Sequence, residues 1–134
     1  MKLQNNEIGP KNDKWRQVNG HYVPGRKFSA IKYNAARRGI PFDLTIEYLD
    51  ELWLLQNGQC LYSGEDLDIT SRNGATASLD RKNSNLGYVE GNVAWVHNDV
   101  NYLKHTLDED RLFELIEKIH ERRKNIDTTE NYHS

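Results

Sequence analysis

Two residues between Ala77 and Lys104 carry side chains that together could hold a metal ion. Asp80 ends a short apolar run that predicts a β-strand, and Asn101 lies where apolar residues recur at helical intervals. A carboxylate at the end of a strand can face oxygen and nitrogen ligands from a helix across a small cleft. Such ligands suit one hard divalent cation, Mg²⁺ or Mn²⁺.

Two histidines flank Asn101 in the sequence. His97, Asn101 and His105 are four residues apart, so they share one face if a helix begins near His97. An imidazole titrates near neutral pH, which makes His97 a candidate general base or a third metal ligand, with the base role preferred. His105 is expected to cap the helix or to support the ligands from behind, with the cap preferred.

A strand–loop–strand–helix order is predicted to position these residues. Residues 78–81 and 92–96 have the composition of strands, and the turn formers at 83–87 predict the loop between them. From about Asn98 the apolar residues follow helical spacing. Asp80 and Asn101 are therefore expected to belong to neighbouring elements.

This segment resembles the ββα-metal motif of HNH (His-Me finger) endonucleases, and more closely a phage and bacterial branch with the pattern SLDR…GY…GNV.WVH…N..K. The resemblance implies that Asp80 and Asn101 bind one divalent metal ion. It also implies that Asn92 steadies the hairpin loop and that Lys104 lies near phosphate. Arg81 stands where the family usually has its general-base histidine.

The arginine at position 81 changes the expected chemistry. Its pKa exceeds about 12, so it cannot accept a proton at neutral pH. Either His97 activates the water, or the metal ion does so alone, or the chain no longer cleaves. Arg81 is then expected to bind the scissile phosphate and to stabilise charge that develops there.

Composition favours one cytoplasmic domain. With 37% hydrophobic residues the core must be modest, and no apolar run approaches the roughly 18 residues of a membrane span. The first residues, MKLQNNEIG, lack the apolar segment of a signal peptide. Cys60 is the single cysteine, so neither an intrachain disulfide nor a structural zinc site built from paired cysteines is expected.

Charge is divided unevenly along the chain. Residues 1–40 contain nine Lys and Arg against two acidic residues, whereas residues 41–134 contain nine against eighteen. A basic segment on an acidic body favours DNA as partner, mainly through backbone contacts. An amphipathic helix predicted at 26–38 supplies Arg26, Lys27, Lys32, Arg37 and Arg38, and the preceding arm supplies Lys14 and Arg16. The alternative is an ordinary solvated helix whose last arginines offset the helix dipole.

The remaining elements are expected to be supporting structure. Thr45 is a predicted N-cap for a helix at 46–57, and Thr106 with Glu109 forms a capping box for a helix at 107–124, expected to pack across the motif helix. The chain is thus read as an α+β domain at 26–125, with its ββα-metal core at 77–105. A basic arm at 1–25 and a tail at 126–134 flank it.

These features predict a small metal-dependent DNA endonuclease or nickase. A second hypothesis is a catalytically inactive HNH-fold module that binds DNA or a protein partner, for which Arg81 is the main argument. A third is an RNA-cleaving toxin that uses the same site. Double-strand cutting would require a homodimer or two successive nicks, and the sequence decides neither.

Overall fold

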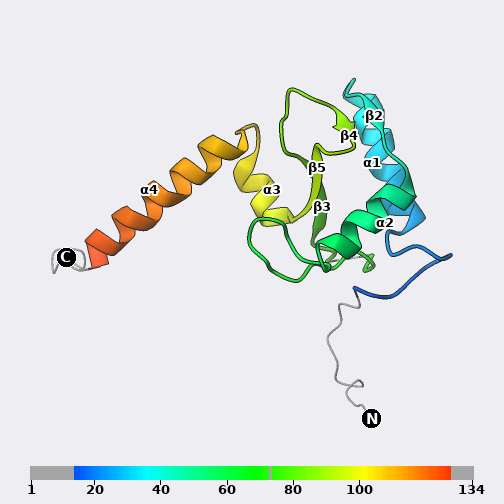
Figure 1. Ribbon diagram of the computed structural model, residues 1–134, viewed down its shortest axis with the longest axis horizontal. Helices are drawn as coiled ribbons and strands as arrows, with labels where there is room; N and C mark the ends of the chain where they lie inside the picture. Colours follow the sequence, from blue (N-terminus) through cyan, green and yellow to red (C-terminus); the bar gives the residue numbers. More distant parts are fainter. Residues whose placement is uncertain (1–13, 73, 128–134) are drawn as a thin grey trace, which may run out of the picture.

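An antiparallel hairpin lies at the centre of the fold (Figure 1). It consists of β3 (Ala77–Arg81) and β5 (Val93–His97), whose register pairs Asp80 with Ala94 and Ala77 with His97. The computed structural model describes residues 14–72 and 74–127. β5 is buried over its first four residues, as expected for a run of apolar and aromatic side chains between two layers.

A second, smaller pairing and three helices surround the hairpin. β2 (Phe42–Asp43) pairs in parallel with β4 (Tyr88–Val89), which lies in the long connection between the hairpin strands. The helices are α1 (Gly25–Arg37), α2 (Ile46–Leu55) and α3 (Asn98–Lys104), of which α3 packs on both strands of the hairpin. The predicted α+β class is confirmed.

The core is centred on two indole rings between α2 and β5. Trp53 and Trp95 are fully buried, and their rings meet edge to face with centroids 5.9 Å apart. Each indole N–H finds a carbonyl: Trp53 donates to Lys14 at 2.8 Å and Trp95 donates to Leu49 at 3.2 Å. The second bond fixes α2 against β5, the strand that leads into α3, and the first fixes α2 against the segment before α1.

Residues 14–24 are fastened to α2. The Nδ1 atom of His21 lies 2.5 Å from a carboxylate oxygen of Asp50, and the other oxygen accepts the Val23 N–H at 2.9 Å. Val23 is fully buried. The part of the predicted arm that the structure describes is therefore docked on the domain, whereas residues 1–13 lie outside the described residues.

Helix α4 (Glu109–Asp127) extends away from the rest of the molecule (Figure 1). Its first turn is docked, because the Tyr62 hydroxyl donates to Glu109 at 2.6 Å and Leu112 is buried. Further along, Ile119 is 63% exposed. The expectation that this helix packs across α3 is wrong: the bend after α3 directs it outward.

Among the described residues, none of the helices has the length and apolar character that a membrane span requires.

Candidate active site

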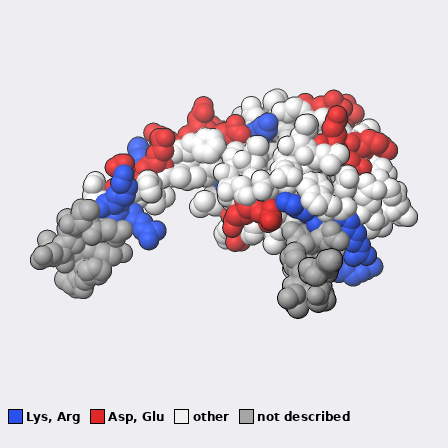
Figure 2. Space-filling model, turned by 60° about the horizontal axis from the view of Figure 1, so that its bottom comes forward, with Lys and Arg blue, Asp and Glu red and all other residues white. Residues whose placement is uncertain are grey.

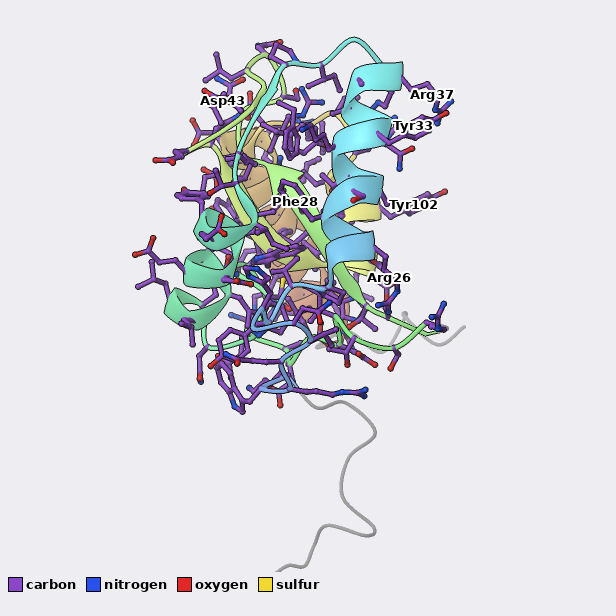
Figure 3. All side chains as sticks on the ribbon, turned by 90° about the vertical axis from the view of Figure 1, so that its right-hand side faces the viewer. Arg26, Phe28, Tyr33, Arg37, Asp43 and Tyr102 are labelled. Carbon is purple, nitrogen blue, oxygen red and sulfur yellow. The ribbon has the colours of Figure 1, made fainter. Side chains whose placement is uncertain are left out.

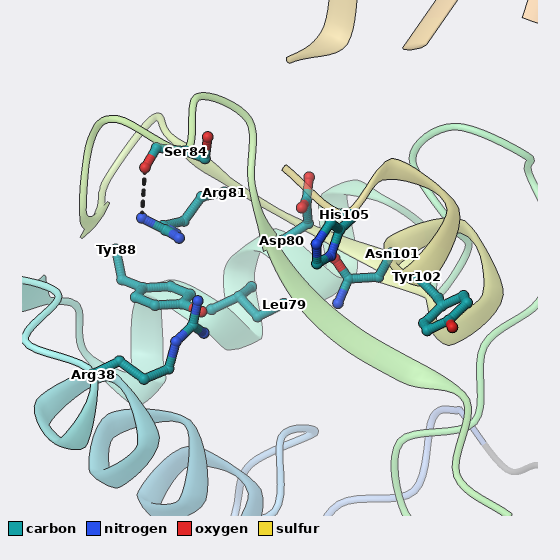
Figure 4. Close-up of a pocket in the computed structure, with 9 residues that line it drawn as sticks. All are labelled: Arg38, Leu79, Asp80, Arg81, Ser84, Tyr88, Asn101, Tyr102 and His105. Atoms are coloured by element: carbon teal, nitrogen blue, oxygen red, sulfur yellow. Dashed lines mark hydrogen bonds between the residues drawn. The ribbon is translucent and has the colours of Figure 1, made fainter. Parts of the chain in front are cut away.

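A cleft of about 260 Å³ opens beside the end of β3 (Figure 4). Three parts of the fold contribute to it: the hairpin with its loop, the exposed side and C-terminal end of α3, and the C-terminal end of α1. The residues that line it are Arg38, Leu79, Asp80, Arg81, Ser84, Tyr88, Asn101, Tyr102 and His105. The strand carboxylate and the helix amide that the sequence paired thus line one cleft.

Asp80 is held from behind by a buried lysine. The Nζ atom of Lys104 lies 3.0 Å from Oδ2 of Asp80, donates to its Oδ1 at 3.3 Å and donates to the Arg81 carbonyl at 2.7 Å. Burial raises the pKa of the Asp80 carboxyl, and the ammonium group opposes that rise. Lys104 is 1% exposed, so its predicted place beside phosphate is not what the structure shows: it fixes the carboxylate and the strand end.

One oxygen of Asp80 is held by an ion pair without a hydrogen bond. Oδ2 is buried and makes no hydrogen bond within the described residues, although the Nζ atom of Lys104 lies 3.0 Å from it. A buried acceptor without a hydrogen bond is costly unless something else coordinates it. Together with the amide oxygen of Asn101 and the ring of His105, it forms a set of oxygen and nitrogen donors that fits one Mg²⁺ or Mn²⁺.

The donor set is sparse for a metal centre. Residues 14–72 and 74–127 contain no group of three or more His, Cys, Asp and Glu side chains that could hold an ion. The single carboxylate is also paired with a lysine, which lowers the net negative charge at the site. A cation there would therefore depend on substrate phosphate to complete its coordination, as Mg²⁺ commonly does.

The histidine at the cleft is His105, whereas His97 lies elsewhere. His97 pairs with Ala77, three positions along the strand from Asp80, which is roughly 10 Å away at the rise of a strand. Its Nδ1 atom accepts the Asp99 N–H at 3.0 Å, so it is the N-cap of α3. Contrary to the prediction, His97 therefore does not share a helical face with Asn101 and His105, because α3 begins only at Asn98.

His105 reaches the cleft through an unusual backbone turn. It is the C-cap of α3, with a φ of 47° and a ψ of −113°, and its N–H bonds to the Asn101 carbonyl at 3.0 Å. Residues other than glycine seldom adopt a positive φ, and such strain is concentrated at functional sites. Figure 4 shows its ring on the same side of the cleft as Asp80 and Asn101. His97 and His105 have the same spacing of four from Asn101, so spacing alone did not distinguish them.

Arg81 both lines the cleft and braces the loop. Its Nη1 atom donates to the carbonyls of Ser84 at 2.9 Å and Leu86 at 3.0 Å, and its guanidinium lies 5.4 Å from the centroid of the Tyr88 ring. A planar guanidinium fixed in this way can still present its remaining N–H groups to a phosphate. The side chain therefore combines a structural role with a position at the cleft.

Asn92 organises the loop between the hairpin strands. Its side chain is buried, its Oδ1 accepts the Asn83 N–H at 3.0 Å, and its Nδ2 donates to the carbonyls of Asn83 at 3.1 Å and Gly87 at 2.8 Å. These are the loop contacts expected of the central asparagine. They act on the site indirectly, by fixing the backbone that follows Asp80 and Arg81.

The predicted DNA-binding residues fall into three groups. Arg38 lines the cleft, and Lys32, Arg37 and Arg16 are exposed. Arg26 donates to the Thr70 carbonyl at 2.8 Å, and burial together with Arg26 lowers the pKa of Lys27. Lys14 is committed internally, because it pairs with Asp66 at 2.7 Å and donates to the Asn57 carbonyl. Figure 3 shows Arg26 and Arg37 projecting on one side of α1.

Comparison with known proteins gives one informative similarity. No family model and no solved structure matches the chain. The chain is 33% identical over 120 residues to a protein of Enterobacteria phage T4 described as an uncharacterized 29.0 kDa protein in the dda-modA intergenic region. The alignment covers 88% of this chain and 40% of the phage protein. The chain thus spans less than half the length of the relative, and the similarity assigns no activity.

Proposed function

We propose that this chain is a metal-dependent nuclease that hydrolyses phosphodiester bonds in DNA through a one-metal site. The observation that carries the proposal is the cleft in which Asp80, Asn101 and His105 meet, with Arg38 and Arg81 on its other side. Acidic, neutral and basic groups are thereby arranged around a space that can admit a phosphate. The phage relative and the single cysteine are compatible with action in the cytoplasm of a bacterium or of an infected cell.

The roles of the chain's own residues follow from their positions. A divalent cation on Asp80 and Asn101 would offset the charge of the phosphate and favour loss of a proton from water. His105 accepts that proton as the water attacks phosphorus, and the bond to the leaving oxygen breaks. Arg38 and Arg81 donate to the phosphate oxygens as negative charge grows. Lys104 positions Asp80.

A binding module without activity is the second candidate. Two observations favour it: Asp80 is already paired with Lys104, and an arginine follows Asp80 where a base is usual in the family that the motif resembles. In that case the cleft would bind phosphate through Arg38 and Arg81 and would hold the strand without hydrolysis. The two candidates differ in their response to metal ions.

Cleavage of supercoiled plasmid in Mg²⁺ or Mn²⁺ tests the proposal. The wild-type chain is expected to nick the plasmid, and EDTA is expected to stop the reaction. His105→Ala is expected to lower the rate at least about 100-fold, the usual contribution of a general base, and Asp80→Asn is expected to lower it by removing a metal ligand. A parallel panel of single-stranded RNA detects the RNA-cleaving alternative.

His97→Asn is the matched control for the choice of base. Asparagine retains the N-cap function of His97 but cannot act as a base, so the helix is preserved. The variant is expected to retain wild-type activity. If His97→Asn lost most of its activity and His105→Ala stayed active, His97 rather than His105 would be the general base. Metal-independent binding with no cleavage in any condition would establish the binding module instead.

A further inference from the structure

Two tyrosines, Tyr102 at the cleft and Tyr33 on α1, are unusually exposed. Tyr102 on α3 is 86% exposed and Tyr33 on α1 is 66% exposed. The other aromatic rings near the hairpin are packed, as with Phe28 against Phe42 and Phe42 against Tyr88. Neither exposed phenol packs against another aromatic ring of the described residues. A surface that leaves two large rings in water has not used them for stability.

The two tyrosines share a side of the molecule with basic side chains. Figure 3 shows Tyr33 and Tyr102 projecting in the same direction as Arg26 and Arg37. Tyr102 also lines the cleft, and Figure 4 shows it across Asp80 from Arg38. A ligand with phosphate groups and flat rings could therefore contact the basic side chains and the tyrosine rings at the same time.

The combination identifies the kind of nucleic acid. Arginines alone would suit the phosphates of any duplex, but the faces of paired bases are stacked on one another and cannot reach a side-chain ring. An unpaired strand offers those faces, and stacking on aromatic side chains is how proteins bind single strands without reading their sequence. The rings of two exposed tyrosines can stack on the bases of a single strand but not on the paired bases of a duplex.

We propose that the surface formed by α1 and α3 binds an unpaired nucleic-acid strand and delivers it to the cleft. Tyr33 and Tyr102 stack on its bases, and Arg37 and Arg38 contact its phosphates. The inference rests on the proposed function, since the strand is the substrate of that same cleft. It narrows the substrate from DNA in general to single-stranded segments, such as flaps, gaps or displaced strands.

Binding without metal tests the inference separately from catalysis. Fluorescence anisotropy in EDTA compares labelled oligothymidine, labelled oligouridine and a duplex of the same length. The single strands are expected to bind more tightly than the duplex, and the two oligomers show whether a DNA or an RNA strand is preferred. Tyr33→Ala and Tyr102→Ala are each expected to weaken single-strand binding about 5- to 100-fold, which is the usual contribution of one stacked base.

Matched variants separate stacking from other effects. Tyr33→Phe and Tyr102→Phe retain the ring and are expected to bind as the wild type does. Leu103→Ala removes a neighbouring side chain of α3 that is 59% exposed but cannot stack, and it is expected to have no effect. Duplex binding should not change in any of these variants.

The results distinguish the inference from the proposed function. Duplex binding as tight as single-strand binding, or unchanged affinity in both alanine variants, would overturn the inference. Single-strand binding that depends on the tyrosines, with no cleavage in Mg²⁺ or Mn²⁺, would support the inference and overturn the proposed function. Cleavage confined to fully paired DNA would leave the nuclease and remove the single-strand surface.

Discussion

The side chain of Lys104 shows how a single residue can organise this site. Its ammonium group neutralises Asp80 and also satisfies the carbonyl of Arg81, at the point where β3 gives way to the loop. Because it is almost completely buried, it holds the carboxylate oriented without competing for space in the cleft. Sequence reasoning placed a cation near the phosphate at this position; burial assigns it to the support of the carboxylate.

Loss of the Lys104 ammonium is expected to cost much of the stability of the chain. Lys104→Met keeps most of the side-chain volume but leaves Asp80 buried without its partner, and removal of one member of a buried pair typically costs about 3–5 kcal/mol. Urea unfolding followed by the fluorescence of the buried Trp53 and Trp95 measures the change. Lys118→Met, on the exposed face of α4, is the control and should alter the free energy of unfolding by less than about 1 kcal/mol. Equal effects of the two substitutions would contradict the buried role.

The backbone strain at His105 is expected to lower the stability of the chain, while its side chain supports the proposed activity. Its positive φ favours glycine, so His105→Gly should raise the free energy of unfolding by about 1 kcal/mol through relief of backbone strain. The same substitution removes the proposed base and should abolish nicking. Urea unfolding and plasmid cleavage on one preparation provide both measurements. A variant that is less stable than the wild type, or one that is fully active, would show that the strain serves no function.

At the scale of elements, local patterns predicted more than packing did. The β3 and β5 strands, the turn-rich loop and the α1 and α2 helices follow from composition, spacing and caps, and Thr45 accepts the Tyr48 N–H as an N-cap should. The start of α3 near Asn98 was also predicted, but the sequence did not show whether His97 would share the helical face of Asn101 or end the strand. The pairing of His97 with Ala77 places His97 at the end of β5, and this explains why His105 rather than His97 lines the cleft.

The docking of α4 depends on tertiary contacts that no periodicity reveals. Its apolar stripe predicted packing along its length, yet only the first turns contact the domain, through the Tyr62 hydroxyl on Glu109 and the Tyr62 ring on Phe113. Burial, and then the hydrogen bond to Glu109, raise the pKa of Tyr62 well above its ordinary value. The hydroxyl is thus held in its protonated, donating form.

Tyr62→Phe is expected to loosen α4 and to alter stability at high pH. The lost bond to a charged acceptor is worth about 1.5–3 kcal/mol, so amides in the first turns of α4 should exchange faster with solvent. Because the folded pKa lies above the unfolded value of about 10, the stabilisation by Tyr62 is complete below that pH and is lost as pH rises toward the folded pKa.

Hydrogen exchange and alkaline unfolding together test this role of Tyr62. The wild type should lose free energy of unfolding above pH about 10 more steeply than Tyr62→Phe does, since the variant lacks the ionisable group. Tyr102→Phe serves as the control because the Tyr102 hydroxyl is exposed and is expected to change neither measurement. Identical pH profiles for the wild type and Tyr62→Phe would remove the hydroxyl from the docking of α4.

For the whole molecule, the distribution of charge in space matters more than its distribution along the chain. The first third of the sequence is basic, but some of its basic side chains bond within the protein: Lys14 pairs with Asp66, and Arg26 donates to the Thr70 carbonyl. Figure 2 shows acidic side chains along the upper edge and lower centre of the body, and basic ones on the outer part of α4 and at the lower right of the body. The cations that line the cleft are therefore few, Arg38 and Arg81, and Arg37 is exposed next to Arg38 at the end of α1.

The dependence of nucleic-acid affinity on salt concentration is expected to show how many of these cations contact phosphate. Each phosphate contact that is lost should lower the slope of the logarithm of the affinity against the logarithm of salt concentration by about 0.7 for a single strand and about 0.9 for a duplex. Arg38→Gln and Arg37→Gln should each produce a change of this size. Lys14→Gln should leave the slope nearly unchanged, because that ammonium is already neutralised by Asp66. Arg111→Gln, on α4 and paired with Glu114, is a second control. If the two controls lowered the slope as much as the α1 variants do, the whole surface rather than the cleft side of α1 would be binding the strand.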